Sequence, residues 1–220
     1  MRIALTGWLA LATIASAHDI SSQVTWAREI SRLLDRHCAS CHREGGSAFP
    51  LTTFQQAQAR AKDIAKSVLE RRMPPFGAVK GFGELRDDQS LTQEQIELVV
   101  HWVQGGALEG DPALAPKSPA HGTPSKAQVK TGAEWISAGA KKLGADATFV
   151  AIRPQSLQGD SVRVVAERPD GTVEPLIWFY RYDPKFTRTY YFRKPLKLPA
   201  GTKIVASVPG ATVALLEPAH

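Results

Sequence analysis

The residues best suited to chemistry lie close together in the segment 35–46, which reads DRHCASCHREGG. Cys38 and Cys41 are separated by two residues, His42 follows directly, and the chain has 2 cysteines in all. Three kinds of site use cysteines at this spacing: a zinc site, a redox-active dithiol, and a covalently attached haem.

Zinc and dithiol chemistry fit the surrounding sequence poorly. A structural zinc site needs four ligands, and no second Cys or His pair follows His42. A thioredoxin-type dithiol opens a helix after a strand. Residues 24–38 instead have the apolar spacing of a helix that precedes the cysteines. C-x-x-C-H is the attachment signal for c-type haem, in which the histidine becomes the proximal iron ligand.

A haem iron that carries electrons commonly has a sulfur atom as its sixth ligand. Met73 is the only methionine after Met1, and it lies in LERRMPPFGAVKGFG. A helix is predicted before it at 54–71, and Pro74 and Pro75 end that helix and stiffen the chain. The alternative is that Met73 only fills a gap in the core. Its place on a proline-fixed loop favours ligation.

The rival sixth ligands are histidines. His37 directly precedes Cys38 and is badly placed to reach the opposite haem face. His101 lies in a predicted helix, on the side away from its apolar stripe, and is expected to face solvent. Thr92 and Gln95 form a predicted capping box at the start of this helix. Residues 18–108 are therefore predicted to form an all-α domain.

The chain begins with the pattern of a secretory signal peptide. Arg2 is followed by an apolar run and then by small residues. We expect residues 1–17 to be removed after Ala17 and the protein to be periplasmic or otherwise exported. The alternative is that the segment is kept as an uncleaved anchor. No second apolar run is long enough to cross a bilayer, so no membrane span is expected in the mature chain.

The second half of the chain has a different character. Residues 109–132 are rich in proline and predict a linker. Residues 133–220 contain short segments rich in Val, Ile, Tyr and Phe, bounded by turn sequences. In one of them, Val162, Val164 and Ala166 alternate with other side chains. The predicted fold class is α+β by separate domains, with an N-terminal all-α domain and a small C-terminal antiparallel β-sandwich.

The first domain resembles class I cytochrome c, through the helix that ends in HCASCH and the later RRMPPF. It is more specifically similar to a bacterial group found fused to monooxygenase-like domains. The resemblance implies one covalent haem c held by four residues: Cys38 and Cys41 through thioether bonds, His42 as proximal ligand and Met73 as distal ligand. It also implies that Pro50 supplies the backbone carbonyl that orients the His42 ring.

The β region resembles the C-terminal domain of copper type II, ascorbate-dependent monooxygenases. The residues that carry this likeness are GDSVR, with Gly159, Ser161 and Arg163, and the turn Pro169-Asp170-Gly171. Gln155 and Ser156 stand where that family has its histidine pair. Copper needs imidazole or thioether ligands, so no copper is expected and the domain is interpreted as degenerate.

The chain has a formal net charge of +6, and basic residues flank the aromatics of the second half. We interpret these basic residues as lying on the solvated faces of strands that cover an aromatic core. The second interpretation is that they form a surface that steers an acidic redox partner. Nucleic acid is not an expected partner of an exported protein.

The predicted function is single-electron transfer to periplasmic redox proteins, with a non-catalytic β domain for docking or stability. The alternative is a haem-dependent oxidoreductase or haem-based sensor that binds a substrate or partner at the β domain.

Overall fold

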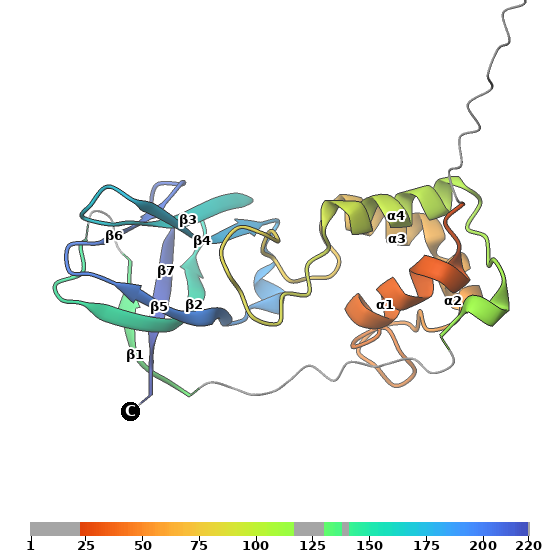
Figure 1. The fold of residues 1–220 in the computed structure, drawn as a ribbon, viewed down its shortest axis with the longest axis horizontal. Helices are drawn as coiled ribbons and strands as arrows, with labels where there is room; N and C mark the ends of the chain where they lie inside the picture. The colour runs from red at the N-terminus through yellow and green to blue at the C-terminus, as the bar shows by residue number, and fades with distance from the viewer. Residues whose placement is uncertain (1–22, 117–129, 138–140, 220) are drawn as a thin grey trace, which may run out of the picture.

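The computed structural model describes residues 23–116, 130–137 and 141–219. The predicted signal peptide, 1–17, and much of the predicted linker lie outside the described residues. A helical N-terminal part is followed by two antiparallel sheets, and the two parts lie side by side (Figure 1). The predicted fold class, α+β by separate domains, is confirmed.

The helical part contains four α-helices. A π-helical turn, Trp26–Ile30, runs directly into α1, and a 3-10 turn, Pro112–Leu114, follows the last helix. The α-helices are α1 (Ser31–His37), α2 (Phe54–Gln58), α3 (Ala61–Leu69) and α4 (Gln93–Gln104). The single helix predicted at 54–71 is therefore two. The break lies at Arg60, whose φ of −118° and ψ of 12° depart from helical values.

The helices enclose one apolar core. The apolar residues that α2 and α3 place on one face are all buried: Ala57, Ala61, Ile64, Ala65 and Val68. The π-helical turn meets α4, with the ring centroids of Trp26 and Trp102 6.4 Å apart. The capping box of Thr92 and Gln95 forms as predicted at the start of α4, and His101 is exposed as expected.

The β part is a sandwich of two sheets. One sheet has the order β1-β7-β2-β5 and the other β4-β3-β6, with antiparallel pairing throughout the described strands. The strands are β1 (Thr131–Ile136), β2 (Ala147–Ser156), β3 (Ser161–Glu167), β4 (Val173–Tyr180), β5 (Tyr190–Leu198), β6 (Lys203–Ala206) and β7 (Thr212–Pro218). A 3-10 turn at Pro184–Phe186 connects the sheets.

Side chains from both sheets fill the space between them. The predicted alternation on β3 is confirmed, because Val162, Val164 and Ala166 are fully buried. The core also contains large residues such as Phe149, Phe179 and Leu215. The basic residues of β5 at 193, 194 and 197 are exposed, in agreement with solvated strand faces.

The segment that connects α3 to α4 leaves the helices and reaches the sheets. In Figure 1 it is the yellow chain that extends from the helical part to the β part and returns. Three of its residues, Phe76, Ala78 and Leu85, are buried in the β core.

Within the described residues, no helix is long and apolar enough to cross a membrane.

Candidate functional site

The chain makes a tight turn where α1 ends, and this turn carries the cysteines and the histidine. Cys38 follows the last residue of α1, and its N–H donates to the carbonyl of Leu34 at 2.8 Å. The N–H groups of Cys41 and His42 both donate to the Cys38 carbonyl, at 3.1 and 2.9 Å. The structure therefore brings the predicted attachment residues together on one turn, positioned by the helix before it.

The two thiols lie in different surroundings. Both cysteines are free, and Cys41 is exposed while Cys38 packs against the helical core. Burial, with a smaller effect of neighbouring Cys41, raises the pKa of the Cys38 thiol to about 12. Redox-active dithiols have a cysteine with a lowered pKa, because the thiolate is the reactive form. The environment of Cys38 thus disfavours the dithiol alternative.

A single backbone contact orients the His42 ring. Its Nδ1 donates to the carbonyl of Phe49 at 2.8 Å. Since a carbonyl can only accept, Nδ1 carries a proton, which leaves Nε2 as the ring nitrogen that could bind a metal. The sequence had assigned the carbonyl to Pro50, and the structure corrects this by one residue. A proline favours an extended backbone in the residue before it, so Pro50 acts on the conformation of Phe49.

Met73 lies just beyond α3. Its N–H donates to the carbonyl of Ser67 at 3.3 Å, and the Met73–Pro74 peptide bond is cis. Its half-buried side chain borders a cavity of about 420 Å³ that Arg71, Arg72 and Arg181 also line. The pairing of Met73 with His42 on one iron stays a prediction.

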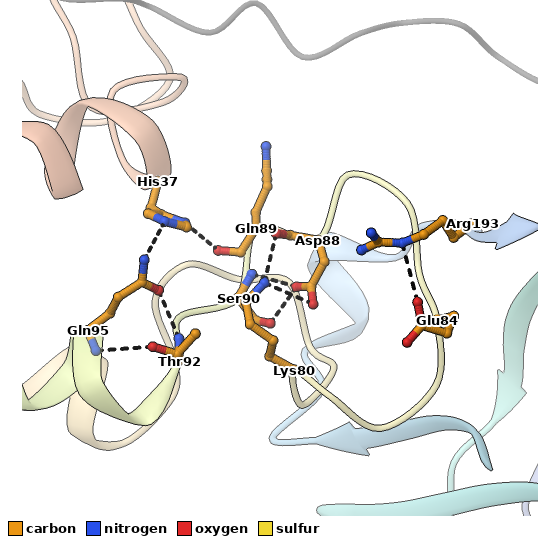
Figure 2. Close-up of polar contacts among 9 residues, drawn as sticks. All are labelled: His37, Lys80, Glu84, Asp88, Gln89, Ser90, Thr92, Gln95 and Arg193. Carbon is orange, nitrogen blue, oxygen red and sulfur yellow. Dashed lines mark hydrogen bonds and ion pairs between the residues drawn. The ribbon is translucent and has the colours of Figure 1, made fainter.

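His37 has a role that the sequence did not indicate. The sequence identified it only as an unsuitable iron ligand, but the structure places it between two partners (Figure 2). Its Nδ1 donates to the carbonyl of Gln89 at 3.1 Å, so its Nε2 accepts from the amide of Gln95 at 3.2 Å. His37 thereby joins the end of α1 to the start of α4 and to the segment before it. Its position next to Cys38 was the only signal in the sequence.

The donor atoms in this region fit a covalently bound haem. Two free thiols stand on one turn with a histidine whose Nε2 is available, and this is the donor set that c-type attachment uses. Met73 offers a thioether on a separate, proline-fixed segment. Gln155 and Ser156 lie at the end of β2.

Comparison with protein families identifies the helical part. Residues 26–103 match the family model described as cytochrome C oxidase, cbb3-type, subunit III. The match contains Cys38, Cys41, His42 and Met73 and ends inside α4, before the first strand. The helical part is therefore a cytochrome c domain. Comparison with curated proteins and with solved structures gave no match.

Proposed function

We propose that the protein is an exported monohaem cytochrome that carries single electrons through a His/Met-ligated haem c. The observation that supports this most strongly is the turn at the end of α1, where C-x-x-C-H lies inside the segment that matches a cytochrome family. A cytochrome c domain in itself implies a haem-based electron carrier.

Each residue of the site has a distinct task. Cys38 and Cys41 would hold the haem covalently, and His42 would bind the iron through Nε2 while the carbonyl of Phe49 orients its ring. Met73 would supply a sulfur ligand, which would raise the reduction potential. The haem supplies one-electron chemistry, and the protein sets its potential and limits access to it.

Export and the role of the β domain are further parts of the proposal. A signal peptide cleaved after Ala17 would direct the chain to the periplasm, where haem is attached and redox partners are met. The β domain, residues 133–220, serves docking or stability in this scheme, and residues 109–132 connect it to residues 18–108. The mass of protein purified from the periplasm tests the cleavage site directly.

The ligation is tested with a Met73→Ala variant produced in a periplasm with haem-maturation machinery. Haem should remain covalently attached after denaturation, because the cysteines and His42 are intact. The oxidised variant should lose the weak sulfur-to-iron absorption band, and the ferrous form should bind carbon monoxide. Its reduction potential should fall by a substantial part of the ~0.8 V range that axial ligands span.

The control is His101→Ala, which removes an exposed side chain of α4 and should leave the optical spectrum unchanged. A Met73→Ala variant whose potential and carbon monoxide binding equal those of the wild type would show that Met73 only packs. A wild-type protein without covalent haem would refute the proposed function as a whole.

One observation favours the alternative, a haem-dependent oxidoreductase or sensor. The cavity of about 420 Å³ beside Met73 lies between the helical and β parts and is lined by Arg181 and Tyr182 as well as by Arg71. A substrate or small ligand could approach the distal side through it. A high-spin spectrum of the wild type, or displacement of its sulfur ligand by carbon monoxide alone, would favour this alternative.

A further inference from the structure

The segment that carries Met73 is also part of the β domain. Three residues after Met73, Phe76 enters the β core with 4% of its surface exposed, and Ala78 and Leu85 follow it. The segment leaves the end of α3 and returns to α4 only after this excursion (Figure 1). Its conformation therefore depends on a domain that lies later in the sequence.

The first half of the segment pairs with the edge of β4. The N–H of Val79 donates to the carbonyl of Trp178 at 2.9 Å, and the N–H of Tyr180 donates to the carbonyl of Gly77 at 3.2 Å. Ala78 and Phe179 form an antiparallel bridge between these bonds. Residues 77–79 thus extend the β4-β3-β6 sheet.

The second half pairs with the edge of the other sheet. The N–H of Arg86 donates to the carbonyl of Tyr191 at 2.8 Å, and the N–H of Arg193 donates to the carbonyl of Glu84 at 2.7 Å. Leu85 forms a bridge with Phe192 on β5. One segment therefore covers an open edge of each sheet, and four of its backbone groups bond to backbone groups of the β domain.

The link between Met73 and the β core is short and stiff. Only Pro74 and Pro75 separate Met73 from Phe76, and proline restricts the backbone of both itself and the residue before it. The buried hydroxyl of Tyr190 donates to the carbonyl of Phe76 at 2.5 Å, and the two rings pack edge to face at 5.3 Å. Movement of Met73 is thus coupled to the packing of Phe76.

The end of the segment that leads into α4 is hydrogen-bonded to α1, the helix that precedes the attachment turn. His37 donates to the carbonyl of Gln89 (Figure 2). One residue earlier, the carboxylate of Asp88 accepts from Ser90 and pairs with Lys80 at 3.1 Å. The segment is therefore fixed both to the β domain and to the residue that precedes Cys38.

From these contacts we infer that the β domain positions Met73 at the iron, by holding residues 76–86 against the edges of β4 and β5. The inference rests on the proposed His/Met ligation and gives the β domain a defined task within it. When the segment is released, a larger fraction of molecules has Met73 detached. An external ligand then binds the iron more tightly, because its apparent affinity scales with the fraction of molecules in which the position is open.

Two glycines of the segment provide a matched pair of variants. Gly81 and Gly83 have nearly equal φ values, +83° and +84°, so alanine strains the backbone similarly at both. A Cβ at Gly83 would overlap the carbonyl oxygen of Leu176 on β4, whereas a Cβ at Gly81 meets nothing within 4 Å. Gly83→Ala therefore pushes the segment off β4, and Gly81→Ala controls for the strain.

The measurement is made on the full-length holoprotein. Gly83→Ala should weaken the sulfur-to-iron band of the oxidised protein and raise the carbon monoxide affinity of the ferrous protein about tenfold over Gly81→Ala. Ala78→Asp is a second variant, since it places a carboxylate in the β core and expels the segment by another route. Gly81→Asp adds the same charge at an exposed position and should behave as Gly81→Ala.

The inference is overturned if Gly83→Ala and Ala78→Asp both keep the wild-type band and carbon monoxide affinity. A failure of the proposed ligation gives a different result. In that case the wild type itself lacks the sulfur-to-iron band, or Met73→Ala leaves the band unchanged. The two failures are therefore separated by the spectrum of the wild type and of Met73→Ala.

Discussion

His37 is held in its neutral form by its surroundings. Burial lowers the pKa of His37 below its usual 6.5, and the nearby cations Lys80 and Arg36 act in the same direction. The hydrogen bond to the carbonyl of Gln89 and the charge of Asp88 oppose this shift but do not cancel it. The ring accepts from Gln95 through its unprotonated Nε2, so protonation would also turn that contact into a clash of two donors.

The depressed pKa of His37 predicts a pH dependence of stability. The unfolded chain takes up a proton at His37 as the pH falls through 6.5, while the folded chain resists it. The free energy of unfolding should therefore decrease as the pH falls below 6.5, until the lower folded-state pKa is passed. Urea unfolding of the wild type and of His37→Gln, compared between neutral and mildly acidic pH, measures this contribution.

In His37→Gln the decrease should be smaller, because the titrating group is gone. His101→Gln controls for the loss of a histidine at an exposed position. An identical decrease in the wild type and in His37→Gln would show that other groups cause the pH dependence.

At the residue scale, the sequence identified the residues that could attach haem but not the backbone group that orients His42. The spacing of Cys38, Cys41 and His42 determined the prediction, and the structure places them on one turn. The carbonyl that orients His42 belongs to Phe49, one residue from the predicted Pro50. A backbone acceptor has no side-chain signature, so the sequence could indicate the neighbourhood of the proline but not the residue.

The start of α4 provides the prediction at the element scale. The hydroxyl of Thr92 accepts from the N–H of Gln95, and the Gln95 side chain returns to the N–H of Thr92. Thr92→Ala removes one side of this capping box and should lower the free energy of unfolding by about 1 kcal/mol. The loss is measured by urea unfolding.

Thr92→Ser is the matched control, because it also loses the methyl group but keeps the hydroxyl that accepts the bond. It should stay close to the wild type. Equal losses in Thr92→Ala and Thr92→Ser would assign the effect to methyl packing and contradict a capping role.

The elements that the sequence predicted well are those with a clear period. The alternation of Val162, Val164 and Ala166 predicted β3, and the helical spacing of Ile96 and Val99 predicted α4. The strand β7 shows no such period, because it lies between β1 and β2 and is buried on both faces, with four consecutive buried residues from 213 to 216. A strand buried on both faces shows no alternation. The exposed edge strand β1 lacks an apolar pattern for the opposite reason.

The largest feature that the sequence did not reveal is the crossing of residues 76–86 to the β domain. The stretch GAVKGFGEL is rich in glycine and has no strand period, so it indicated only a loop. Its pairing partners, such as Trp178 and Tyr191, lie about a hundred residues away along the chain. Long-range pairing of short segments leaves no local sequence pattern. The predicted separation of two domains by a linker at 109–132 therefore did not account for the contact of residues 76–86 with the β domain.

This crossing predicts that a substitution in the cytochrome domain destabilises the β domain. Phe76 lies within the segment 26–103 but is buried against Tyr190 in the β core. Phe76→Ala should lower the free energy of unfolding by about 3–5 kcal/mol, the usual cost of removing a buried phenylalanine. The loss should appear in an infrared signal of the strands during urea unfolding.

The shared segment also predicts that the strand signal and the helical circular dichroism of the wild type change at the same urea concentration, as in a single cooperative transition. Phe76→Ala should lower the urea midpoint of the strand signal, alone or together with the helical signal, because it weakens the packing of the β core. Phe186→Ala, which truncates an exposed phenylalanine of the same β domain, should change stability by no more than about 0.5 kcal/mol. A Phe76→Ala variant that lowers only the helical signal would contradict the coupling, since it would place Phe76 energetically with the helices.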